Sequence, residues 1–138
     1  MNALLQATAI VKQHEGLRLL VYVIDGHETI GFGRDMRSEG ITEAEADYLL
    51  QNDLVAAHTF LQTFTWYGNL TSNQVAALLD MVYNLGKRGF EEFKTMIACL
   101  ASGDYAGAAA AMQNSLWAKQ VGQRALDDAT LMRSSQVQ

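Results

Sequence analysis

The feature of this sequence that most restricts the fold is a single strand-forming segment. The other apolar residues of the chain repeat at helical spacing. Leu19 to Ile24 is an apolar run rich in residues that favour strands. Asp25-Gly26 follows, a strong signal for a two-residue hairpin turn, and His27 to Gly33 supplies the return strand. Because a single hairpin is not stable alone, it has to pack on helices, and the predicted fold is α+β, mainly α.

The rest of the chain shows the apolar periodicity and the capping residues of helices. Thr42 with Glu45 and Thr71 with Gln74 each form the pattern of a capping box ahead of an apolar stripe. The predicted helices cover about 2–15, 42–62, 71–86, 90–100, 104–114 and 121–132.

The length of 138 residues fits one compact domain with a real core. We expect a single domain over 1–138, with a hairpin lobe at about 14–40 and a helical lobe at about 63–138 that also includes the first helix. The long helix at 42–62 joins the two lobes. A cleft between the lobes is the expected ligand site.

Composition and charge exclude several classes of protein. The net charge of −5 argues against a nucleic-acid binder, which would normally carry a basic face. No apolar run approaches the length of a membrane span, and the first helix is amphipathic rather than a secretory signal, so a cytoplasmic location in the producing cell is expected. The three histidines lack the spacing of metal ligands, and we expect no metal, no cofactor and a monomer.

Three residues around the hairpin carry the chemistry of glycoside hydrolysis. That reaction needs a protonated carboxyl group beside the leaving oxygen and usually a second carboxylate. Glu15 ends the first helix, Asp25 lies at the hairpin tip, and Thr29 offers a hydroxyl on the return strand. Taken alone, these residues are equally typical of a solvated surface acid, a turn aspartate and a strand threonine.

Four motifs, in the same order along the chain, favour the catalytic interpretation. They are HEGLRL at 14–19 with Tyr22 and TIGFG at 29–33, then ITEAEA at 41–46 with LLQND at 49–53, then MVYNLG at 81–86 with 90–93, and finally Trp117 with GQRA at 122–125. Together they resemble the phage-type lysozymes, glycoside hydrolase family 24, over nearly the whole chain.

The resemblance implies a lysozyme-like fold and a function. Glu15 would be the general acid, and Thr29 would help to place the nucleophilic water. The substrate would be peptidoglycan, cut between N-acetylmuramic acid and N-acetylglucosamine after the protein is released to the cell wall. Burial of Glu15 would raise its pKa and keep the acid protonated.

The second carboxylate departs from the family pattern. Ile24 occupies the position of the family's aspartate, and Asp25 stands one residue later. A shift of one residue in a strand turns the side chain to the other face, but a turn residue has more freedom, so Asp25 remains the candidate. Glu28 is a poorer choice because it neighbours Thr29 and should point to the opposite face.

The resemblance also implies two ion pairs. Arg34 stands where the family commonly has a histidine, and pairing with Asp53 would tie the hairpin to the long helix. Arg124 stands where the family has an arginine that pairs with the catalytic glutamate, which here would lower the pKa of Glu15 and oppose the effect of burial.

Three further residues are candidates for contacting the glycan. Tyr83 and Asn84 fall where the family lines its cleft with an aromatic and an amide side chain. Trp117 is a candidate sugar platform, although a tryptophan at such a position also serves as core.

Three alternative functions remain open at the level of the sequence. A lytic transglycosylase needs only one acid–base glutamate, and the displaced Asp25 is compatible with that reaction. A catalytically dead peptidoglycan-binding homologue would keep the fold and the glycan affinity. A small helical interaction protein would require all four motif matches to be accidental.

Overall fold

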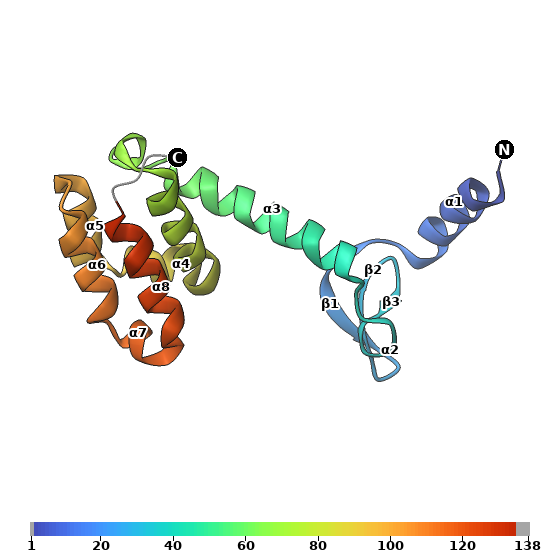
Figure 1. Cartoon of the computed structure of the whole chain (residues 1–138). Helices are drawn as coiled ribbons and strands as arrows, with labels where there is room; N and C mark the ends of the chain where they lie inside the picture. Colours follow the sequence, from blue (N-terminus) through green and yellow to red (C-terminus); the bar gives the residue numbers. More distant parts are fainter. Residues whose placement is uncertain (1, 135–138) are drawn as a thin grey trace. The chain divides into compact units, whose positions relative to one another are not determined.

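A computed structural model describes residues 2–134 and confirms the predicted α+β, mainly α fold (Figure 1). The elements are α1 (Ala3–Glu15), β1 (Arg18–Ile24), β2 (His27–Gly31), β3 (Arg34–Asp35), α2 (Met36–Glu39), α3 (Glu43–Leu61), η1 (Tyr67–Asn69), α4 (Ser72–Glu91), α5 (Lys94–Ser102), α6 (Tyr105–Gln113), α7 (Leu116–Val121) and α8 (Gln123–Arg133). Contacts divide the chain into two compact units, Met1–Tyr48 and Leu49–Gln138, which we call the hairpin unit and the helical unit.

Helix α1 begins and ends close to the predicted residues. The Asn2 side chain caps it by accepting hydrogen bonds from the backbone N–H groups of Leu4 and Leu5, at 2.8 and 3.1 Å. The last helical residue is Glu15, as the sequence predicts. The division by contacts places α1 in the hairpin unit, in which no residue of α1 is buried, and the expected grouping of this helix with the later helices stays a prediction.

The hairpin forms at the predicted turn. Asp25 and Gly26 both have positive φ, +49° and +78°, which is the requirement of the turn type whose twist matches two antiparallel strands. The register pairs Tyr22 with Thr29 and Ile24 with His27. An irregularity between Arg18 and Tyr22 interrupts the pairing of β1 nearer its start.

Two short elements after the hairpin are absent from the predicted pattern. β3 adds a third antiparallel strand, in which Asp35 pairs with Thr29 and Arg34 with Ile30. The Asp35 side chain then caps α2 by accepting from the N–H groups of Arg37 and Ser38. Elements of two and four residues are too short to show an apolar period, so local capping is their only sequence signal.

The helical unit contains the apolar core. α8 packs against α4 and α6, and α5 packs against α6. The largest wholly buried side chains are Phe90, Leu61, Leu78, Met81, Met96, Leu100, Met112 and Met132. Two predicted boundaries differ from the structure: α4 continues past a kink at Gly86 to Glu91, and the segment before 122 forms a separate helix, α7.

Candidate active site

The hairpin unit contains a pocket of about 450 Å³ between the end of α1 and one face of the sheet. We call it the hairpin pocket. Glu15, Asp25 and Thr29, the three residues that the sequence nominates for catalysis, all line it. The other lining residues are His14, Arg18, Tyr22, Ile24, His27, Gly33 and Asp35.

Strand register explains which side chains reach this pocket. Residues that lie opposite each other, and residues two apart on a strand, share one face of a sheet. Thr29 lies opposite both Tyr22 and Asp35, and Ile24 lies opposite His27, so all five share the pocket face.

The neighbouring residue Glu28 is on the other face of the sheet, as the sequence predicts. Its carboxylate lies 3.3 Å from Nη2 of Arg37, and it does not line the hairpin pocket. Glu28 is therefore separated from the pocket although it is next to Thr29 in the sequence.

The carboxylate of Glu15 packs directly against Gly33. A Cβ atom built on Gly33 would overlap the Glu15 side chain, and the φ of +76° at Gly33 also favours glycine. The second glycine of the TIGFG motif, Gly33, therefore allows the Glu15 carboxylate to approach the backbone closely. Glu15 is exposed, so the burial that we expected is not found in the hairpin unit, and its carboxylate has no hydrogen-bond or ion-pair partner within residues 2–134.

Thr29 is the buried member of the site. It is 4% exposed, and its hydroxyl donates a hydrogen bond of 3.1 Å to the carbonyl oxygen of His27. Because the hydroxyl hydrogen is used in this way, its lone pairs remain to accept a hydrogen bond from a water or a sugar hydroxyl.

Asp25 is exposed at the hairpin tip and lines the same pocket. Aspartate tolerates the left-handed conformation better than most residues, which explains why the turn accepts it. Within residues 2–134 its carboxylate has no hydrogen-bond or ion-pair partner. The side chain can thus offer its negative charge to the pocket.

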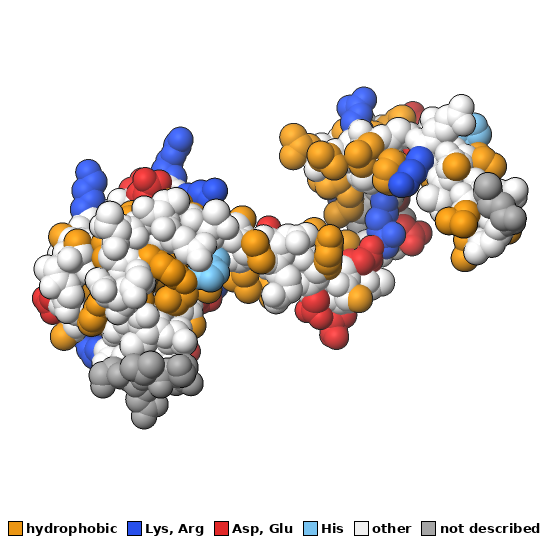
Figure 2. All heavy atoms as spheres, turned by 90° about the horizontal axis from the view of Figure 1, so that it is seen from above, with side chains coloured by type: hydrophobic (Ala, Val, Ile, Leu, Met, Phe, Trp, Pro, Cys, Tyr) orange, Lys and Arg blue, Asp and Glu red, His pale blue; other side chains and the backbone are white. Residues whose placement is uncertain are grey.

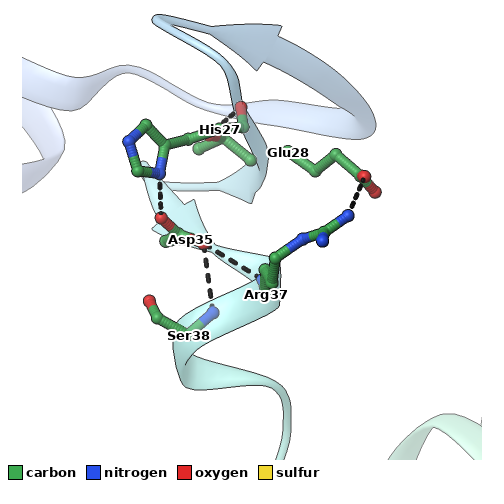
Figure 3. A network of polar contacts seen from close by, with 6 residues as sticks. His27, Glu28, Asp35, Arg37 and Ser38 are labelled. Atoms are coloured by element: carbon green, nitrogen blue, oxygen red, sulfur yellow. Dashed lines mark hydrogen bonds and ion pairs between the residues drawn. The ribbon is translucent and has the colours of Figure 1, made fainter.

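A polar network that sequence reasoning missed borders the pocket (Figure 3). Nδ1 of His27 lies 2.6 Å from Oδ2 of Asp35, and Oδ1 of Asp35 accepts from the N–H groups of Arg37 and Ser38 at 3.0 and 3.2 Å. The N–H of Ser38, with His27 and the N–H of Arg37, lowers the pKa of Asp35 below its ordinary value. The sequence signal that could have indicated a role for His27 is its spacing of two from Thr29, which places both side chains on one face of the strand.

Within the hairpin unit Arg34 binds Gly40 and Glu45, and its predicted pairing with Asp53, a residue of the helical unit, stays a prediction. Its Nε donates to the carbonyl oxygen of Gly40 at 2.8 Å, and its Nη2 lies 3.8 Å from Oε1 of Glu45. Both partners belong to the hairpin unit, in which Arg34 joins the start of β3 to the first turn of α3.

Within the helical unit Arg124 is paired with Asp80, and its predicted pairing with Glu15, a residue of the hairpin unit, stays a prediction. Its Nε and Nη2 donate to the two carboxylate oxygens of Asp80 at 2.9 and 2.6 Å, a bidentate pair between α8 and α4. The guanidinium lowers the pKa of Asp80. Asp128 is next to this pair, and burial, followed by its hydrogen bond with Asp80, raises the pKa of Asp128 to about 8.

The residues predicted to contact the glycan divide into two groups. Tyr83 is 47% exposed and, with Asp53 and Lys87, lines a second pocket of about 430 Å³ within the helical unit. Trp117 is only 4% exposed, and its Nε1 donates to Oδ1 of Asn84 at 2.8 Å. Trp117 and Asn84 therefore hold each other, and Trp117 belongs to the core.

Two properties of the described residues bear on cofactors and membranes. In residues 2–134, no group of three or more His, Cys, Asp and Glu side chains is arranged to hold a metal ion. Of the helices in the same range, none is both long enough and apolar enough to cross a membrane.

Comparison with known proteins finds relatives that span most of the chain. The family model described as phage lysozyme matches residues 12–135, which include every residue of the hairpin pocket. The endolysin of Acyrthosiphon pisum secondary endosymbiont phage 1 is 33% identical over 119 residues, covering 83% of this chain and 80% of that endolysin. The pre-baseplate central spike protein Gp5 of Enterobacteria phage T4 is 28% identical over 155 residues, covering 90% of this chain and 27% of the spike protein.

Proposed function

We propose that this chain, which belongs to the phage lysozyme family and is a peptidoglycan-lysing lysozyme, is a muramidase. The bond cleaved is the β-1,4 link between N-acetylmuramic acid and N-acetylglucosamine. Cleavage occurs by hydrolysis once the protein has been released to the cell wall. The observation that carries this proposal is the meeting of Glu15, Asp25 and Thr29 around one pocket.

Each of the three residues has a separate task. Glu15, in its protonated form, gives its proton to the glycosidic oxygen as the bond from that oxygen to the anomeric carbon breaks. Asp25, which has no competing partner within residues 2–134, stabilises the positive charge that develops on the sugar ring. The lone pairs of Thr29 accept a hydrogen bond from the attacking water.

Tyr83 is the aromatic side chain proposed to contact a sugar. Its half-exposed ring borders a pocket that Asp53 and Lys87 also line. An amphipathic ring of this kind can pack on the apolar face of a sugar while neighbouring polar groups bind its hydroxyls. Asn84 and Trp117 hold each other by their hydrogen bond and do not line this pocket.

The test is lysis by Glu15→Gln compared with the wild type. Turbidity of permeabilised Gram-negative cells measures lysis, and analysis of products from purified peptidoglycan identifies the bond. We expect Glu15→Gln to lose roughly 10²–10⁴-fold in rate, because glutamine cannot donate the proton. Glu28→Gln is the matched control, since Glu28 is in the same unit but on the opposite face. Near-full activity of Glu15→Gln, or 1,6-anhydromuramic acid as the product, would refute the proposed hydrolysis.

A further inference from the structure

His27 has the position of a catalytic group that the family resemblance does not assign. It shares the pocket face with Thr29, two residues later on β2, and lies opposite Ile24 on β1. Its side chain is 63% exposed, so water reaches the ring. Residues two apart on a strand project from the same face of the sheet, with Cα atoms roughly 6.6 Å apart, so both side chains border the same water-accessible space.

Asp35 determines which ring nitrogen of His27 carries the proton. An ionised carboxylate can only accept hydrogen bonds, so Nδ1, at 2.6 Å from Oδ2 of Asp35, has to be the donor. The backbone N–H groups of Arg37 and Ser38 lower the pKa of Asp35 and hold its carboxylate in place. The neutral ring then carries its lone pair on Nε2, the nitrogen drawn on the side away from Asp35 (Figure 3).

We propose that His27, oriented by Asp35, is the base that accepts the proton of the attacking water. This inference rests on the proposed hydrolysis and supplies the step that it leaves open. The water oxygen, held by Thr29, forms a bond to the anomeric carbon while the bond from that carbon to the leaving oxygen breaks. The leaving oxygen takes the proton of Glu15, and the proton of the water passes to Nε2 of His27.

The step ends with balanced charges. Glu15 becomes a carboxylate and His27 an imidazolium, which Asp35 stabilises through the Nδ1–H bond. His27 returns its proton to solvent and Glu15 regains one. His27 is therefore a catalytic residue and Asp35 a positioning residue, while Asp25 retains the task of stabilising positive charge on the sugar.

Charged groups of both signs line the pocket around the ring. Asp35 on β3 is the nearest anion, and Asp25 and Glu15 also line the pocket, whereas Arg18 opposes them. The titratable and charged groups that face the pocket are His14 and Glu15 from α1, Arg18 and Tyr22 from β1, Asp25 from the turn and Asp35 from β3.

The test is the effect of His27→Gln and Asp35→Asn on kcat and KM, with Glu28→Gln as the neighbouring control. His27→Gln should lose about 10²-fold in kcat and keep its KM, because the base is lost while the glycan contacts remain. Asp35→Asn should lose less in kcat and also keep its KM, because His27 is still present but its ring is no longer oriented by the carboxylate. Glu28→Gln should keep both constants of the wild type.

A measurement on the wild type makes the test independent of whether the variants fold. Nitrogen-15 NMR of the histidine rings should show neutral His27 protonated at Nδ1, and protonation at Nε2 instead would overturn the proposal. If Glu15→Gln is inactive while His27→Gln keeps the kcat of the wild type, the inference about His27 fails and the proposed function stands. If the wild type cleaves no glycan, the proposed function fails first.

Discussion

The helical unit and the hairpin unit hold their residues in place by different means. In the helical unit, Leu61, Phe90 and Met112 are wholly buried in a continuous apolar core. In the hairpin unit, Thr29 is the one buried residue among 2–48, and Leu20 and Val23 are among the exposed apolar residues. Figure 2 shows hydrophobic side chains on the molecular surface.

The hairpin unit relies on polar contacts and turns where the helical unit relies on apolar packing. Asp35 caps α2 and binds His27, and Arg34 binds Gly40. Such contacts each contribute little to stability but fix direction, which a pocket lined by acids and an imidazole requires. The comparison predicts that substitutions in the helical unit change mainly stability, and that those in the hairpin pocket change mainly activity.

The largest effect is expected for Phe90→Ala. Phe90 is wholly buried and contacts Phe60 and Phe64, so its removal leaves a cavity among aromatic rings. We expect a loss of about 3–5 kcal/mol in the free energy of unfolding, measured by urea denaturation. Val23→Ala, at an exposed position of β1, should change it by less than about 0.5 kcal/mol. Equal losses in the two variants would contradict the division between the units.

A smaller effect on stability is expected for Asp128→Asn, because Asp128 is a polar exception within the helical unit. It is 3% exposed, and its Oδ2 is buried without a hydrogen-bond partner in the described part of the chain. Its pKa of about 8 lies above that of an unfolded aspartate, so the folded state binds the proton more tightly. The resulting stabilisation is complete below about pH 4 and is lost as the pH rises through 8.

Asp128→Asn keeps the side chain neutral and should remove this pH dependence. At pH 9 it should be more stable than the wild type by on the order of 1–3 kcal/mol, and at pH 4 the two should be similar. Melting curves followed by circular dichroism at several pH values provide the measurement. Asp127→Asn, at an exposed neighbouring position, is the control and should keep most of the pH dependence of the wild type, because Asp127 is the last-ranked of the causes that shift the pKa of Asp128. If wild-type stability rose from pH 5 to 8 relative to Asp128→Asn, the assignment of the proton would be wrong.

The sequence predicted those features that depend on neighbouring residues. The caps at Thr42 and Thr71 and the turn at Asp25-Gly26 form where the pattern indicates, because their hydrogen bonds and φ angles are local. The pairings predicted for Arg34 and Arg124 are between residues of different units and stay predictions. Within its own unit each arginine binds an acceptor that packing brings near, which the sequence pattern does not show.

The contact between His27 and Asp35 escaped prediction for a related reason. The two residues are on different strands, and only the addition of β3 beside β2 brings them to one face. β3 has two residues, which are too few for a period of two to be visible in the sequence. The sequence could thus indicate Glu15, Asp25 and Thr29 as residues of the hairpin pocket. It could not indicate β3, the strand that contributes Asp35.

The smallest effect is expected for Ile24→Asp, which places a carboxylate where the family has its aspartate. Ile24 shares the pocket face with Thr29 and is 55% exposed, so the new carboxylate would reach the pocket at little cost to the fold. If Asp25 already stabilises the sugar from the turn, a second carboxylate beside it adds only like-charge repulsion, and lysis should stay within about threefold of the wild type.

Asp25→Asn determines how that small effect is to be interpreted. Asparagine supports the same turn, so the melting temperature should hold while lysis falls by about two orders of magnitude, as expected when a charge-stabilising group is lost. In the double variant, which combines Ile24→Asp with Asp25→Asn, the carboxylate at position 24 replaces the one at position 25. If the double variant regains the activity that Asp25→Asn loses, the pocket accepts the charge from either position, and the family's spacing is one of two workable registers. If it stays inactive, only the left-handed turn aims the carboxylate correctly. We expect the second result, because Ile24 lies opposite His27 in the strand register, and an aspartate there would face the imidazole ring instead of the sugar.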